Sequence, residues 1–166
     1  MLPTWNGVTG RETVLGLLAY TPIRSWEGTF CLASSLSLYI DFTDLYESIF
    51  QPLEDALLED DVTTGQVALL TFYKNLLDQW MVSLLSQPHS VEEAQATITT
   101  LVNHASNLSL TIIQNTNTVS AHSTILDFYE TTAALITHPT LKPIVRITIP
   151  PAEVIYSLLF TTSIST

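Results

Sequence analysis

The clearest alternation of apolar and polar positions lies in residues 124–139, TILDFYETTAALITHP. Apolar and polar side chains recur there at steps of three and four residues and fall on opposite sides of a helical wheel. The apolar set is Ile125, Phe128, Tyr129, Leu135 and Ile136, and the polar set is Asp127, Glu130, Thr131 and Thr137. The spacing predicts an amphipathic helix that ends near His138, because Pro139 disfavours helical dihedrals in the residue before it.

Two shorter helices are predicted in the first third of the chain. Thr9 and Glu12 have the spacing of a capping box, which predicts a helix that runs to about Tyr20. Residues 43–59 have helical spacing as well, and Pro52 predicts a kink or a restart near Phe50. The charge-poor, serine-rich residues 28–43 between them fit neither a helix nor a strand, and we interpret them as either an insertion or an ordinary loop.

Residues 63–86 predict a long helix with an unusually wide apolar face. Such a face cannot be buried by one neighbour, so we expect this helix to have contacts on two sides. The apolar positions are Leu69, Leu70, Phe72, Tyr73, Leu76, Leu77, Trp80, Met81, Leu84 and Leu85.

A second long helix is predicted over residues 90–114, and a capping box of Ser90 and Glu93 marks its start. Its apolar positions alternate three- and four-residue steps for three heptads, and they are Val91, Ala94, Ile98, Leu101, Ala105, Leu108 and Ile112. This regularity is typical of a coiled-coil seam for a partner helix, or of the core stripe of a helix hairpin within one chain. We favour the core stripe, because two of these positions are small alanines with further apolar residues beside them.

The last part of the chain predicts an extended segment followed by an apolar helix. Prolines bracket a β-branched run over residues 142–150, and Pro151 suits the first turn of a helix. The segment 151–162 has almost no polar face, which is typical of a helix buried on all sides. We therefore expect a missing downstream partner for this helix and interpret residues 1–166 as one segment of a longer helical array.

Composition and charge limit the classes of partner. With 46% hydrophobic and 13% charged residues, the chain is too apolar to be disordered. The net charge of −11 argues against direct binding to a phosphate backbone. The acidic run Glu54, Asp55, Glu59, Asp60 and Asp61 predicts a solvated helix end or, alternatively, a patch for a basic partner. The lone Cys31, the absence of a signal-peptide pattern and the shortness of the apolar run 30–40 predict a soluble intracellular protein.

The sequence offers little catalytic chemistry. His89, His104, His122 and His138 are scattered over different predicted elements, and we interpret them as surface or cap residues rather than metal ligands. Asp127 and Glu130 are one helical turn apart, as an acid–base pair requires, but any solvated helix face has the same spacing. We expect Trp5, Trp26 and Trp80 to be core or staple residues. No catalytic, cofactor-binding or metal-binding residue is assigned, and the chain is predicted not to be an enzyme.

Four stretches together resemble the centromere protein I family, the large helical-repeat subunit of the inner kinetochore. They are LPTWNGVTGRETVLGLLAYTPIRS (2–25), DLYESIFQPLE (44–54), ILDFYETTAALITHP (125–139) and RITIPPAEVIYSLLFTTSIST (146–166). The resemblance implies a nuclear, non-enzymatic scaffold at the centromere, which assembles with centromere proteins H, K and M during cell division. It carries no functional residue onto a numbered position.

The predicted fold is all-α, with antiparallel helices stacked as in an α-solenoid of the HEAT type. The predicted function is protein binding, without cofactor, membrane or small-molecule substrate. Two alternatives stay open, namely another α-solenoid adaptor for transport or chromatin, and a helical enzyme or ligand-binding domain.

Overall fold

A computed structural model of the chain describes residues 5, 7–21, 47, 50–58, 62–86, 91–141 and 150–160. Within this part of the chain the protein forms six helices and no strand, which confirms the predicted all-α class. The helices are α1 (Arg11–Leu18), α3 (Gln51–Leu58), α4 (Val62–Ser86), α5 (Val91–Asn115), α6 (Val119–Thr137) and α7 (Ala152–Phe160). The predictions for residues 28–43, for residues 142–149 and for Cys31, Trp26 and His89 fall outside the described residues.

Helix α4 lies at the centre of the arrangement. It packs against α1, α3, α5 and α6, so the prediction that its wide apolar face has contacts on more than one side is confirmed. Its buried positions fall within one arc of about 160° of the helical wheel and are Gly65, Gln66, Leu69, Leu70, Phe72, Tyr73, Leu76, Leu77, Trp80 and Leu84. The core of the molecule is therefore centred on this wide face of α4 rather than on the amphipathic helix at residues 124–139.

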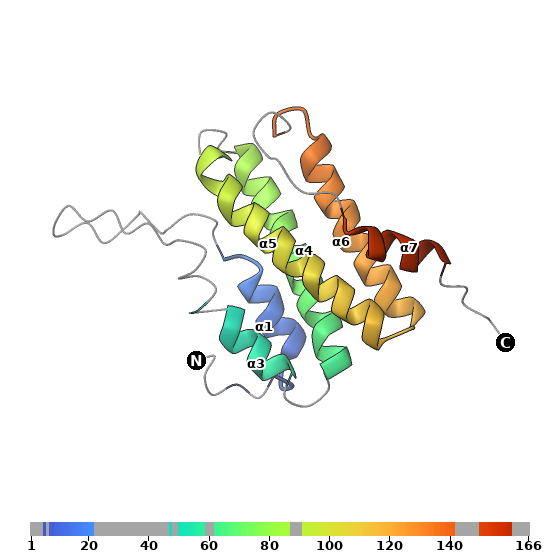
Figure 1. Cartoon of the computed structure of the whole chain (residues 1–166). Helices are drawn as coiled ribbons and strands as arrows, with labels where there is room; N and C mark the ends of the chain where they lie inside the picture. Colours follow the sequence, from blue (N-terminus) through green and yellow to red (C-terminus); the bar gives the residue numbers. More distant parts are fainter. Residues whose placement is uncertain are drawn as a thin grey trace.

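The helices alternate in direction along the chain. Figure 1 shows α1, α4 and α6 running one way and α3 and α5 running the other way. Within the first set, α4 contacts both α1 and α6. Helix α7 belongs to neither set and contacts α5. The two sets are joined by contacts of α3 with α4, of α4 with α5, and of α5 with α6. Helices that follow one another from α3 to α6 thus pack as antiparallel neighbours.

Helix α1 is held by contacts at both of its ends. The indole Nε1 of Trp80 donates a hydrogen bond of 2.7 Å to the carbonyl of Thr21, just beyond the helix. Before the helix, Gly7 has a φ of +70°, and a Cβ atom there would lie 1.9 Å from the carbonyl oxygen of Ala56. Only glycine allows this approach of the backbone to α3.

The predicted capping box of α1 is wrong. The residue before the helix is Gly10, in a left-handed conformation with φ 65°, and no side chain caps the helix. The carbonyl of Thr9 instead accepts a 2.7 Å hydrogen bond from Nε1 of Trp5. A glycine that readily adopts positive φ has replaced side-chain capping at this helix start.

The apolar stripe of α5 is a core stripe, as we favoured. Ala94, Ile98, Leu101, Ala105 and Ile112 are buried, and Leu108 is partly buried against the same core. Their neighbours are α4, α6 and α7 of this chain, which leaves no seam for a partner helix along these positions.

Helix α6 confirms its predicted end and corrects its predicted polar face. It ends at Thr137, and His138 follows in an extended conformation, as Pro139 requires. It begins at Val119, where the Thr118 hydroxyl accepts a 3.3 Å hydrogen bond from the backbone of Ala121. Thr131, assigned to the polar face, is only 7% exposed. Because α6 packs against both α4 and α5, its buried arc is wider than one apolar stripe.

The prediction that the last helix is buried on all sides is not met within the described residues. Val154 is the buried residue of α7, whereas Ile155, Tyr156, Leu159 and Phe160 are exposed. Helix α7 contacts α5, and Leu158 is partly buried against the core.

Candidate functional site

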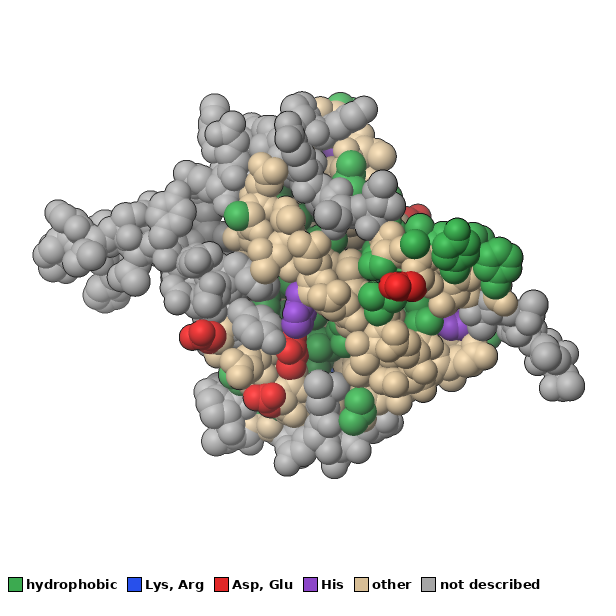
Figure 2. All heavy atoms as spheres, in the orientation of Figure 1, with side chains coloured by type: hydrophobic (Ala, Val, Ile, Leu, Met, Phe, Trp, Pro, Cys, Tyr) green, Lys and Arg blue, Asp and Glu red, His purple; other side chains and the backbone are tan. Residues whose placement is uncertain are grey.

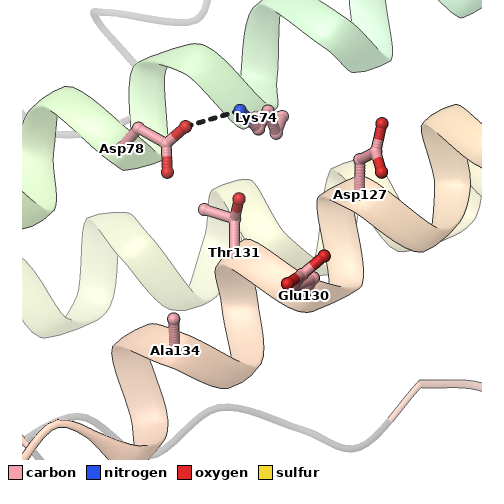
Figure 3. Close-up of a pocket in the computed structure, with 6 residues that line it drawn as sticks. All are labelled: Lys74, Asp78, Asp127, Glu130, Thr131 and Ala134. Atoms are coloured by element: carbon pink, nitrogen blue, oxygen red, sulfur yellow. Dashed lines mark ion pairs between the residues drawn. The ribbon is translucent and has the colours of Figure 1, made fainter.

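A solvent-open hollow of about 330 Å³ lies between α4 and α6 (Figure 3). Helix α4 contributes Lys74 and Asp78, and α6 contributes Asp127, Glu130, Thr131 and Ala134. The two helices pack against one another, so these side chains are held on two sides of one depression rather than on separate surfaces. One positive and three negative side chains line it, which favours a cation over an anion or a neutral ligand.

Lys74 and Asp78 form an ion pair on the α4 side of the hollow. The Lys74 Nζ lies 2.8 Å from Oδ2 of Asp78, one helical turn further on. Lys74 is the only lysine or arginine between residues 25 and 141. Because it is already paired with Asp78, it leaves the negative charge of the α6 side largely uncompensated.

Thr131 is a buried polar residue at the centre of the α6 side. Figure 3 shows its hydroxyl oxygen directed from α6 toward α4, into the hollow. The hydroxyl of the next residue, Thr132, donates a 2.9 Å hydrogen bond to the carbonyl of Phe128. The hydroxyl of Thr131 makes no such bond within the described part of the chain. The hollow therefore contains a hydroxyl that is open to solvent and not hydrogen-bonded to the described residues.

The exposed apolar face of α7 is a second candidate surface. Figure 2 shows hydrophobic side chains gathered over this helix. The rings of Tyr156 and Phe160 are stacked, with centroids 6.1 Å apart and an interplanar angle of 15°. Ile155 and Leu159 are exposed beside them. Clustered aromatic and aliphatic side chains of this kind are typical of protein-interaction surfaces.

A third polar cluster joins α3, α4 and α5. Glu54 Oε1 accepts a hydrogen bond from the Tyr73 hydroxyl and lies 2.6 Å from Nε2 of His104. The side chains of Glu54 and His104 are 14% and 33% exposed. The rings of Tyr73 and His104 meet edge to face, with centroids 5.6 Å apart. Because these groups satisfy one another, the cluster joins three helices and leaves no free catalytic group.

This cluster corrects two predictions from the sequence. Glu54 belongs to the acidic run, which we interpreted as solvated. Of the two members of the run that the structure describes, Asp55 is exposed and Glu54 is partly buried. His104 has a carboxylate partner that lies 50 residues away in the sequence, so no local spacing revealed it. His138 follows the last residue of α6, which confirms its interpretation as a cap residue. Trp80 is buried and Trp5 packs partly against the core, as expected.

The hydroxyl of Tyr129, at the interface of α6 with α5, is less well hydrogen-bonded than the groups of this cluster. Its hydroxyl oxygen is buried and has no hydrogen-bond partner in the part of the chain that the structure describes. Burial raises the pKa of Tyr129, and the nearby hydroxyls of Ser106 and Ser109 lower it by a smaller amount without reaching hydrogen-bond geometry. Ser109 donates instead to the carbonyl of Ala105.

From the sequence, two of the six residues that line the α4–α6 hollow stand out as a possible pair. We interpret Asp127 and Glu130, one turn apart, as a solvated face, and both are exposed. Thr131 is assigned to the polar face of the same helix, and Lys74 and Asp78 are not identified. The isolated lysine four residues before an aspartate was a usable signal, because that spacing predicts an ion pair on a helix. Nothing in the sequence indicated that α4 and α6 place the two groups together.

Metal binding and membrane insertion find no support in the described residues. No group of three or more histidine, cysteine, aspartate or glutamate side chains is placed there to share a metal ion. None of the described helices combines the length and the hydropathy that crossing a bilayer requires.

Comparison of the chain with protein-family models, with curated proteins and with solved structures found no match.

Proposed function

We propose that this chain is a segment of a non-enzymatic helical scaffold that binds other proteins at the inner kinetochore. The observation that carries the protein-binding part is the exposed apolar face of α7, formed by Ile155, Tyr156, Leu159 and Phe160. Leaving these side chains in water is unfavourable, at about 25 cal/mol for each Å² of apolar surface. A partner that covers them gains this free energy.

The arrangement of the helices supports a scaffold of the α-solenoid type. Antiparallel neighbours and contacts within the α1, α4 and α6 set are what successive helical hairpins produce when they pack side by side. The exposed face of α7 then corresponds to the surface on which a further hairpin or a partner helix packs. In helical-repeat proteins each repeat contacts its neighbours, and the stacked repeats form extended surfaces. Partner helices bind along these surfaces.

The kinetochore setting rests on the resemblance of four stretches to the centromere protein I family. It places the protein in the nucleus, with centromere proteins H, K and M as partners during kinetochore assembly and chromosome segregation. The net charge of −11 agrees with protein partners and disfavours naked DNA as a direct ligand of this segment.

The test is co-purification of the tagged full chain with co-expressed centromere proteins H, K and M. We expect recovery of at least one of these subunits, and loss of it in the variant Tyr156→Ser/Phe160→Ser. The matched control is Leu17→Ser/Val82→Ser, which removes two exposed apolar side chains that lie on α1 and α4 rather than on α7.

Three results contradict the proposal. Recovery of no kinetochore subunit overturns the setting, and specific recovery of transport or chromatin proteins identifies a different α-solenoid adaptor. Equal loss of binding in both double variants removes the assignment to α7. A gel-shift titration with naked DNA completes the test, since tight binding by this chain contradicts the electrostatic argument.

A further inference from the structure

We infer that the hollow between α4 and α6 binds an arginine side chain of a partner protein. Charge is the first argument. Three carboxylates and one ammonium group line the hollow, and that ammonium group is already paired with Asp78. Asp127 and Glu130 on the α6 side are exposed and carry the excess negative charge. A cationic group that enters the hollow is attracted to them.

The second argument is the hydroxyl of Thr131. Thr131 is 7% exposed and therefore 93% buried. Its hydroxyl oxygen is directed into the hollow (Figure 3). A hydroxyl oxygen accepts hydrogen bonds through two lone pairs, and the Thr131 hydroxyl forms no hydrogen bond with the described residues. Fixed polar groups without partners are the features that orient a ligand in a binding site. The acidic lining alone does not supply such a feature.

The shape and the spread of the acceptors favour a guanidinium group over a metal ion. No three carboxylate or histidine groups in the described residues converge on a point that a metal ion would occupy. The acceptors instead lie along one face of α6, at Asp127, Glu130 and Thr131. A guanidinium group has five N–H donors in a planar fork and reaches several acceptors at once, whereas an ammonium group is a compact point charge.

The size of the hollow agrees with one side chain rather than a larger ligand. A volume of about 330 Å³ is at the lower end of the roughly 300–1,000 Å³ range of small-molecule pockets. Ala134 at the edge of the hollow offers a methyl group to the apolar stem of an arginine. Long basic side chains pack their methylene groups in this way while the charged end reaches polar partners.

The inference deepens the protein-binding function proposed above, and its test requires no partner protein. Chemical shifts of the ¹⁵N-labelled full chain are followed during titration with N-acetyl-arginine amide. The comparison ligands are N-acetyl-citrulline amide, which has a similar shape without charge, and N-acetyl-lysine amide. Calcium and magnesium chloride form separate arms.

We expect saturable shifts around Thr131 and Asp127 with the arginine ligand only. The variant Asp127→Asn/Glu130→Gln should weaken binding by at least about tenfold, since it removes the excess charge at similar shape. Thr131→Val should weaken it by about threefold to tenfold, and Thr131→Ser should restore it because the hydroxyl is kept. Asp55→Asn on α3, the matched control, should leave the affinity unchanged.

Several results overturn the inference. One is the absence of any chemical-shift change at the hollow with the arginine ligand, and another is equal affinity for the citrulline or the lysine ligand. Saturable binding of calcium or magnesium at the same residues also overturns it. So does an equal loss of arginine affinity in Asp55→Asn and in the double variant. Failure of the co-purification experiment together with a positive titration would refute the kinetochore partners and leave the arginine site standing.

Discussion

The tyrosines Tyr73, which is buried, and Tyr129, which is partly buried, differ in how their hydroxyl groups are bonded. Tyr73 lies where α3, α4 and α5 meet, and its hydroxyl is bonded to Glu54. Tyr129 lies on α6 against α5, and its hydroxyl oxygen is buried with no partner among the described residues. The aromatic rings differ in the same way. Phe50 is fully buried against Phe72 and Tyr73, whereas Phe160 on α7 is 71% exposed.

This difference distinguishes a region that stabilises the fold from a region whose groups are available to a partner. Around Tyr73, polar groups find partners and large side chains pack within the chain, which favours a stable and specific core. From α6 to α7, the molecule keeps an unengaged Thr131 hydroxyl, an acidic hollow and an exposed apolar face. Groups that lack partners among the described residues remain available for another molecule, so we propose that the α6–α7 region, defined as residues 119–141 and 150–160, carries the binding.

The largest effect is expected from truncating one phenylalanine in each region. Phe50→Ala should lower the free energy of unfolding by about 3–5 kcal/mol, because it removes a ring packed against two others and leaves a cavity. Phe160→Ala is the matched control and should change it by less than about 0.5 kcal/mol, since its ring is exposed. Urea unfolding followed by circular dichroism measures both. Similar losses in the two variants would show that α7 is part of the folding core.

A smaller effect is expected from removing each buried tyrosine hydroxyl. Tyr73→Phe should destabilise the protein by about 1–3 kcal/mol, because a carboxylate that is mostly buried loses a donor. Tyr129→Phe should be neutral or stabilising by up to about 1 kcal/mol, since it removes a polar group that has no partner. Thermal unfolding of the two variants at neutral pH provides the comparison. A destabilising Tyr129→Phe would indicate that its hydroxyl has a bonded partner in solution.

The smallest effect concerns the ionisation of Tyr129 in alkaline solution. Burial raises its pKa above the ordinary value of 10.0. The neutral form is therefore favoured in the folded state, and the resulting stability is present below pH 10.0 and lost as the pH rises through the folded-state pKa. The alkaline loss of stability should be smaller in Tyr129→Phe than in the wild type. Equal losses, measured by urea unfolding at several pH values, would contradict a raised pKa.

The sequence predicted the elements that depend on local patterns. The end of α6 before Pro139, the long helix over residues 63–86 and the core stripe of α5 follow from spacing and proline chemistry. These features need no knowledge of distant contacts. The capping box at Thr9 failed because Gly10 adopts a positive φ, which local spacing does not reveal.

The candidate sites depend on contacts across the chain and were only partly predictable. The pairing of His104 with Glu54 and the placement of Lys74 opposite Asp127 require the packing of separate helices. The burial of Thr131 likewise follows from the second neighbour of α6, which a helical wheel does not include. The apolar character of α7 was evident from its sequence, but its exposure was not.

Hydrogen–deuterium exchange of the full chain, with and without a co-purified complex of centromere proteins H, K and M, tests the central assignment most directly. We predict that the complex slows amide exchange in α7 (Ala152–Phe160) and leaves exchange in α3 (Gln51–Leu58) unchanged, because α7 carries the exposed apolar face and α3 is joined to α4 and α5 within the chain. Slower exchange in α3 with no change in α7 would contradict the assignment of binding to the α6–α7 region.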